Sequence, residues 1–173
     1  NVGATVAAVS AAAAQGAVVV VCPELGITGY SAGDLFRMEL LLEAAADGLR
    51  TLAAELVGLR DVVAVVGLPV RVADGRVYNA AAVVSAGVVH GIVPKQYLPN
   101  RHEFYEDRWF TRALGAELPT HHDGIPFGTD LVFPLVGHPG ATLAVEICED
   151  LWVPVPPSSF RIMRQVLDRL EDS

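Results

Sequence analysis

Residues 17–24 run Ala17-Val18-Val19-Val20-Val21-Cys22-Pro23-Glu24, an apolar stretch that stops at a proline and a carboxylate. Four consecutive valines without polar alternation predict a strand that is buried on both faces. Pro23 ends this strand, and three glycines between residues 26 and 33 predict a loop after it. The Ala-rich residues 4–15 predict a preceding helix that ends near Gly16.

The rest of the chain continues the alternation of helices and strands. A helix is predicted from Asp34, a good N-cap, to about residue 59, and a second buried strand is predicted over residues 62–70. Two further segments predict a β-hairpin that turns at Ala86-Gly87. The order of these elements indicates an α/β fold with a mixed sheet. The hairpin strands are residues 77–85 and 88–93, residues 94–127 are irregular and favour a functional loop, and short strands are predicted over 131–135 and 142–148.

Composition excludes several classes of protein. The 173 residues fit one domain, and 52% of them are hydrophobic, which is enough for a substantial core. Twelve basic and twenty acidic residues give a net charge of −8, which argues against nucleic acid or an anionic membrane as a partner. Two cysteines make no disulfide framework, and no apolar run reaches the roughly 18 residues that a membrane span requires. We therefore expect a cytoplasmic protein, although the sequence lacks an initiator Met and could be truncated.

Three side chains with complementary chemistry each follow a predicted buried strand. Glu24 could act as a base, Lys95 could stabilise negative charge, and Cys148 could act as a nucleophile. Each also has an ordinary explanation, as a loop glutamate, a turn lysine or a buried structural cysteine. Cys22 is a weaker candidate because its strand should bury it. Sites in such sheets usually lie at the carboxyl ends of the strands, so the combination favours an active site.

The segments around these residues resemble the nitrilase (carbon–nitrogen hydrolase) superfamily, whose triad is Glu, Lys and Cys in that order. Residues 22–30 resemble the base motif, residues 94–100 the lysine motif and residues 146–152 the nucleophile motif. The flanks, namely residues 28–35, residues 103–110 and the acidic pair after Cys148, resemble the glutaminase branch found in NAD synthetases. The resemblance covers residues 1 to about 159. It implies a four-layer α-β-β-α sandwich, incomplete at both ends.

The resemblance also implies a mechanism. Cys148 would attack the side-chain carboxamide of glutamine, while Glu24 would move the proton from the thiol to the departing ammonia. Lys95 and the backbone N–H of Glu149 would hold the oxyanion, and Glu103 would match the second glutamate that orients the lysine. The substrate-binding residues would be Tyr30, which matches a tyrosine of the glutamine pocket, and Arg101, at a position where relatives carry a tyrosine.

Partners and cofactors follow from the same resemblance. Residues 1–159 would form a partial glutaminase domain, and residues 160–173 would form an amphipathic helical tail of uncertain origin. The ammonia would serve ATP-dependent amidation of deamido-NAD by a synthetase domain, in a homo-oligomeric assembly. No Ser-Gly-Gly-x-Asp-Ser loop is present, so ATP and magnesium would belong to that missing domain, and the glutaminase domain would need neither metal nor cofactor.

Two alternatives remain open from the sequence. The first is a stand-alone carbon–nitrogen hydrolase that acts on another small amide. The second is a non-catalytic remnant that serves as an interaction module, with the apolar stripe of the tail helix as its binding surface.

Overall fold

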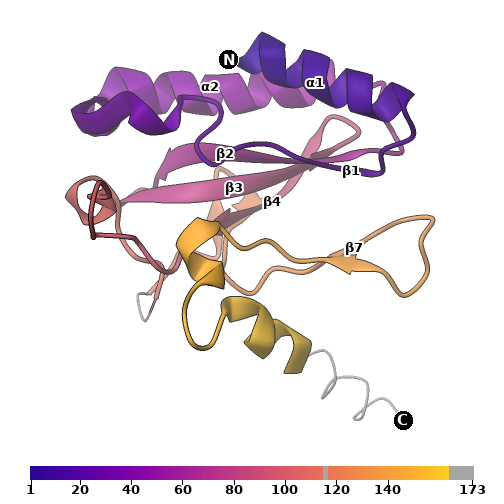
Figure 1. Ribbon diagram of the computed structural model, residues 1–173. Coiled ribbons are helices and arrows are strands. Elements are labelled where there is room, and N and C mark those ends of the chain that lie inside the picture. Colours follow the sequence, from indigo (N-terminus) through magenta and orange to yellow (C-terminus); the bar gives the residue numbers. More distant parts are fainter. Residues whose placement is uncertain (115–116, 164–173) are drawn as a thin grey trace.

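The computed structural model describes residues 1–114 and 117–163. A four-stranded sheet forms its centre, and helices α1 (Val2–Ala14) and α2 (Glu39–Glu55) lie side by side on one face of it (Figure 1). The segment that carries β7 (Phe133–Pro134) and the 3₁₀ helix η3 (Cys148–Leu151) lies on the opposite face (Figure 1). The predicted α/β class is confirmed.

The sheet is mixed, as predicted. Its strands are in the order β1-β2-β3-β4, and β1 runs parallel to β2 whereas the other neighbours are antiparallel. Ala86 and Gly87 connect β3 to β4 with φ angles of 50° and 83°, and positive φ at both positions is typical of the tight turns that suit hairpins. The bounds are Val19–Val21 for β1, Val63–Arg71 for β2, Val77–Ser85 for β3 and Val88–Pro94 for β4.

The two faces of the sheet belong to two apolar clusters. Alternate residues of β2, such as Val66 and Leu68, pack with α2 in the larger cluster. Val65, which points to the other face, packs instead with Val145 and Ile147 in the segment before Cys148. This alternation follows from the two-residue period of a strand. Both faces are therefore covered, and the segment before Cys148 is anchored by its own apolar side chains.

Strand β1 is less buried than predicted. Val19 and Val20 are half-buried, but the side chain of Val21 is 72% exposed. β1 lies at one edge of the sheet and pairs with β2 only, within the described residues. The expectation of burial on both faces was therefore wrong, because four valines in a row cannot reveal whether a neighbouring element covers the strand.

Asp34 does not begin the long helix. The chain forms a 3₁₀ helix, η1 (Tyr30–Arg37), which is interrupted at Gly33, and α2 begins only at Glu39. The Asp34 carboxylate instead accepts hydrogen bonds from the side chains of Arg108 and Trp109. The Asp34 carboxylate was predicted to cap the helix, but it binds two side chains that are distant in the sequence instead.

The second half of the chain is mostly irregular. The short strands predicted over residues 131–135 and 142–148 are present as β7 and β8, but each has only two residues, and the two strands pair antiparallel. The long loop after β4 also contains a short 3₁₀ helix and a two-stranded hairpin. The bounds are Glu106–Arg108 for η2, His121–His122 for β5, Ile125–Pro126 for β6 and Thr142–Leu143 for β8.

The predicted tail helix falls partly outside the described residues, which end at 163. Residues 157–163 are helical, so this helix begins three residues earlier than predicted. Phe160 and Met163 belong to its predicted apolar stripe, and their side chains are 61% and 56% exposed. Within residues 1–114 and 117–163, no helix is long and apolar enough to cross a membrane.

Candidate active site

The loop after β1 carries Glu24 across the neighbouring strand. Gly67 of β2 lies beneath this loop, and a Cβ atom at Gly67 would lie 2.4 Å from the backbone nitrogen of Leu25 and 2.7 Å from the carbonyl oxygen of Pro23. The N–H of Ile27 donates to the carbonyl of Gly67 at 3.1 Å, which fixes the loop there. A glycine is needed at this position because only a bare backbone permits such an approach.

Lys95 follows β4 and is fully buried. Its ammonium donates to Glu24 Oε1 at 2.6 Å and to the two carboxylate oxygens of Glu106 at 2.9 Å each. A buried charge is tolerated only when it is paired, and here two carboxylates surround it. Glu24 and Lys95 therefore meet, although 71 positions separate them in the chain.

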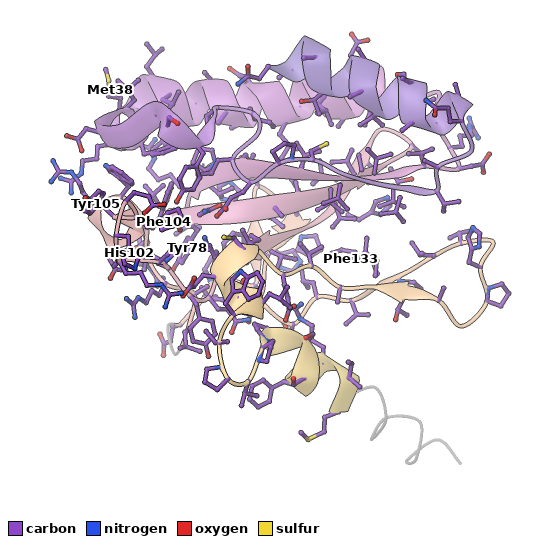
Figure 2. The ribbon with its side chains drawn as sticks, viewed as in Figure 1. Met38, Tyr78, His102, Phe104, Tyr105 and Phe133 are labelled. Carbon is purple, nitrogen blue, oxygen red and sulfur yellow. The ribbon has the colours of Figure 1, made fainter. Side chains whose placement is uncertain are left out.

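The second glutamate at the lysine is Glu106 and not Glu103. Glu106 is 1% exposed and begins η2, whereas Glu103 is exposed to solvent. The assignment of Glu103 to Lys95 was therefore wrong. Both residues lie in the same acidic and aromatic segment, and spacing from the lysine could not show which carboxylate the turn would direct inward. In the sequence, Phe104 and Tyr105 separate the two glutamates. Figure 2 shows both aromatic residues at the same end of the sheet as Tyr78.

Asn79 completes the polar cluster. Its side chain is 1% exposed on the central strand β3, and its amide donates to Glu24 at 2.6 Å and to Glu106 at 3.4 Å. Sequence reasoning missed this residue, although an amide in an otherwise apolar strand pattern was a usable signal. Two carboxyl groups, one ammonium and one neutral donor thus form a single hydrogen-bonded network.

Cys148 begins the 3₁₀ helix η3 on the far side of the sheet from the two long helices. It is exposed to solvent and adopts a φ of 47°, an uncommon backbone conformation for a residue with a side chain. Such strain costs of order 1–3 kcal/mol and is found most often at functional sites. The thiol therefore sits on a turn that the surrounding structure must hold in place.

A cavity of about 200 Å³ lies beside Cys148, and Glu24 is the member of the polar cluster that lines it. Glu24 and Cys148 both line it, together with Cys22, Gly67 and Glu146. The remaining lining residues are mostly apolar side chains of β1, β2, β3 and the segment before Cys148. A small concave site with few polar groups suits a small ligand with one reactive end.

A larger cavity of about 540 Å³ lies elsewhere, between α2, the sheet and the β5–β6 hairpin. Neither Cys148 nor any member of the polar cluster lines it. The chemistry therefore points to the smaller cavity, because size without a nucleophile, base or charge stabiliser does not make an active site.

The electrostatics of the site keep the ammonium charged and the thiol protonated. Burial works against the charge on Lys95, but Glu24 and Glu106 outweigh it, and the pKa of Lys95 is raised. Burial also raises the pKa of Glu106, with Lys95 and Tyr30 opposing the shift. Partial desolvation and the Glu24 carboxylate raise the pKa of Cys148, and Lys95 only partly offsets them. Attack by the thiol thus requires a base to take its proton.

The remaining predicted site residues lie around this centre. The Tyr30 hydroxyl donates to Glu106 Oε1 at 2.7 Å. The pKa of Tyr30 is raised, mainly by burial and to a smaller extent by this hydrogen bond. Arg101 is 64% exposed and pairs with the Glu149 carboxylate at 3.0 Å. Glu149 directly follows Cys148, so this pair places a cation near the nucleophile and partly neutralises the neighbouring acid.

Comparison with known proteins gives a consistent result. The sequence profile of the family described as carbon–nitrogen hydrolase matches residues 1–159. A glutamine-dependent NAD(+) synthetase of Mycobacterium tuberculosis (strain ATCC 25618 / H37Rv) is 44% identical over 147 residues, which is 84% of this chain and 21% of that relative. The same-named protein of Acinetobacter baylyi is 35% identical over 138 residues, or 80% of this chain and 22% of the relative.

Solved structures agree with these sequence matches. A glutamine-dependent NAD(+) synthetase from Cytophaga hutchinsonii superposes with a TM-score of 0.75 at 33% identity, over 86% of this chain and 25% of that one. A carbon–nitrogen hydrolase from Helicobacter pylori gives 0.60 at 21% identity, over 93% and 49%, and supports the fold alone. The fold is therefore nitrilase-like, and the chain spans about a fifth of the length of the curated relatives that it matches.

Proposed function

Since this chain belongs to the carbon–nitrogen hydrolase family, we propose that it hydrolyses the side-chain amide of glutamine to glutamate and ammonia. The observation that carries the proposal is the cavity that Glu24 and Cys148 line together, with Lys95 bonded to Glu24 at 2.6 Å. These two observations support a site in which Glu24 acts as the base, Lys95 as the cation and Cys148 as the nucleophile. The names of the relatives support glutamine as the amide.

The reaction has two halves. Cys148 Sγ bonds to the amide carbon while Glu24 accepts the thiol proton, and Glu24 then transfers this proton to the nitrogen as the carbon–nitrogen bond breaks and ammonia leaves. Water next attacks the γ-glutamyl thioester, and Glu24 accepts one of its protons. The carbon–sulfur bond breaks, and the proton returns to the sulfur as glutamate departs.

The same residues stabilise the charge that develops on the amide oxygen. In our proposal this oxygen accepts hydrogen bonds from the Lys95 ammonium and from the backbone N–H of Glu149. Glu106 and Asn79 hold Lys95 and Glu24 in place, so the donors need little rearrangement during the reaction. The raised pKa of Lys95 keeps its charge available throughout the physiological range.

The ammonia has an evident use. We propose that it reaches a synthetase domain, in the same longer protein or in an associated one, that amidates deamido-NAD. ATP and magnesium would be bound by that domain. The fraction of the relatives that this chain spans, about 21%, leaves room for such a domain. Cys22 and Cys148 form no disulfide with each other, and we propose a cytoplasmic location.

Release of ammonia tests this proposal. The purified chain is incubated with glutamine, asparagine and a series of short ω-amides, and ammonia is measured beside a Cys148→Ala variant. We expect glutamine to be the preferred substrate and the variant to be inactive. Preference for another amide would favour the stand-alone hydrolase, and equal ammonia release by the variant would refute the role of Cys148.

A further inference from the structure

Asp150 is a buried carboxylate that the reaction described above does not use. It is 3% exposed, within η3 and two residues after Cys148. Burial raises its pKa, and three backbone N–H groups oppose that shift. A buried carboxylate with this many donors is structurally committed, since it could not leave them unpaired without cost.

The three donors come from the two sides of the active site. Asp150 Oδ1 accepts from the N–H groups of Gln96 at 3.0 Å and Tyr97 at 2.8 Å. Its Oδ2 accepts from the N–H of Ile147 at 3.2 Å. Gln96 and Tyr97 directly follow Lys95, and Ile147 directly precedes Cys148. The Asp150 carboxylate therefore links the backbone just after Lys95 to the backbone just before Cys148.

This link explains how the strained turn is held. Cys148 has a φ of 47°, and such a conformation persists only where its surroundings fix it. Upstream, Val145 and Ile147 anchor the chain in the apolar cluster below the sheet. Downstream, the side chain of Asp150 supplies the polar anchor, and it attaches to the loop of Lys95 rather than to its own segment alone.

We propose that Asp150 is a positioning residue that holds the turn of Cys148 in register with Lys95. The proposal deepens the function given above and rests on it for the role of the thiol. Asp150 itself touches no reacting atom. It acts by keeping the sulfur and the ammonium at a constant separation, and displacements of about 1 Å are enough to lower a rate by about 10²-fold.

Substitution of Asp150 by asparagine separates the effect of the two acceptor oxygens from the effect of side-chain shape. Asn has the same size but only one acceptor oxygen, so Asp150→Asn keeps at most the two bonds of Oδ1 and sets an NH₂ group against the N–H of Ile147. Asp150→Ser is a second variant, with one short acceptor. Asp61→Asn is the matched control, because Asp61 is an exposed residue before β2.

Two measurements are made on each variant. Backbone hydrogen exchange reports whether residues 95–98 and 146–150 open, and labelling by a diazoketone analogue of glutamine reports alignment at Cys148. We expect faster exchange confined to these two segments, together with labelling slowed about tenfold or more. Alkylation of Cys22 by iodoacetamide serves as an internal reference and should not change.

Three outcomes would overturn the proposal. These are unchanged exchange in both segments, faster exchange with unchanged labelling, or loss of the folded state in both variants, as shown by general exchange and exposure of Cys22. The last would make Asp150 a support of the whole domain. If the unmodified chain neither releases ammonia nor reacts with the diazoketone, the proposed function fails, whereas the exchange measurement still decides whether Asp150 joins the two segments.

Discussion

Residues 1–94 and residues 95–163 of this protein are built in different ways. The first region holds helices α1 and α2 and all four strands of the central sheet, and the pairing of β2, β3 and β4 is interrupted by one register shift, between Val83 and Val84. The second region contains two-residue strands and short 3₁₀ helices, and it holds its shape through side-chain bonds such as those of Asp34 to Arg108 and Trp109.

The candidate active site draws on both regions. Glu24 and Asn79 come from the regular region, while Lys95, Glu106 and Cys148 come from the irregular one. Strand pairing of β3 positions Asn79, and the hydrogen bond from Ile27 to Gly67 fixes the loop of Glu24. Buried polar contacts position Lys95 and Glu106 instead. The proposed chemistry therefore depends on the contacts between the two regions, where a small number of hydrogen bonds position the side chains.

Replacement of each cysteine by alanine should produce the largest difference in ammonia release between the two regions. Cys148→Ala removes the nucleophile on the irregular side and should lower ammonia release from glutamine by about 10³-fold or more. Cys22→Ala changes the thiol at the end of β1 and should lower it less than about threefold, because Cys22 lines the cavity without a charged partner. Steady-state ammonia assays check both values, and similar losses would remove Cys148 from its proposed role.

The two regions should also differ in how they tolerate loss of a cation. Lys95→Met leaves the Glu24 and Glu106 carboxylates without their cation, and breaking such a buried ion pair typically costs about 3–5 kcal/mol of stability. Removal of an oxyanion donor lowers the rate about 10²–10³-fold. Arg71→Met at the end of β2 breaks a surface pair with Glu39 that is worth about 0–1 kcal/mol. Urea unfolding and ammonia assays measure these effects. Equal stability of the two variants would contradict the buried network.

The two glutamates of the irregular region provide a sharper comparison. Glu106→Gln keeps the shape of the side chain but removes the charge that orients Lys95, and misplacement of the ammonium should lower ammonia release by about 10²-fold. Glu103→Gln alters an exposed residue and should change it less than about twofold. A larger effect at Glu103 would mean that Lys95 changes its partner during the reaction, contrary to the contacts described above.

Close packing between the Glu24 loop and β2 should make Gly67 intolerant of a side chain. Gly67→Ala places a Cβ atom against the backbone of residues 23–25 and should cost about 1–3 kcal/mol. Gly58→Ala meets open space after α2 and should stay within about 0.5 kcal/mol of the parent. Thermal unfolding compares them. An unaffected Gly67→Ala variant would show that the loop does not lie so close to the strand.

The smallest expected effect concerns pH. Partial desolvation and Glu24 raise the pKa of Cys148, so its alkylation should reach half its maximal rate above the ordinary thiol value of about 8.5. Glu24→Gln removes a negative charge and should lower this midpoint, whereas Lys95→Met should raise it. The pKa of Cys22 is raised by burial, so Glu24→Gln should leave its midpoint unchanged. Iodoacetamide rates across pH, resolved by peptide mass, test this, and parallel shifts of both thiols would contradict it.

Much of the regular region could be predicted because its information is local. The hairpin at Ala86-Gly87, the helix of residues 4–15 and the strand of residues 62–70 match α1, β2, β3 and β4 closely. Side-chain periodicity and turn chemistry act over a few residues, so they are visible without a structure. Errors arose where a partner lies far away, as for Asp34, or where burial depends on a neighbouring element, as for Val21.

The sequence by itself determined the α/β class and the mixed sheet, and it singled out three candidate site residues that follow predicted strands. Only the tertiary structure decided that Glu106 rather than Glu103 faces Lys95, that Asn79 bridges the two carboxylates, and that Asp150 joins the two loops. The physical reason is that burial of a polar side chain is decided by the donors that the folded chain brings to it from distant segments. Periodicity predicts which face of a strand or helix a residue occupies, but it does not predict which charged group from a distant segment will contact it.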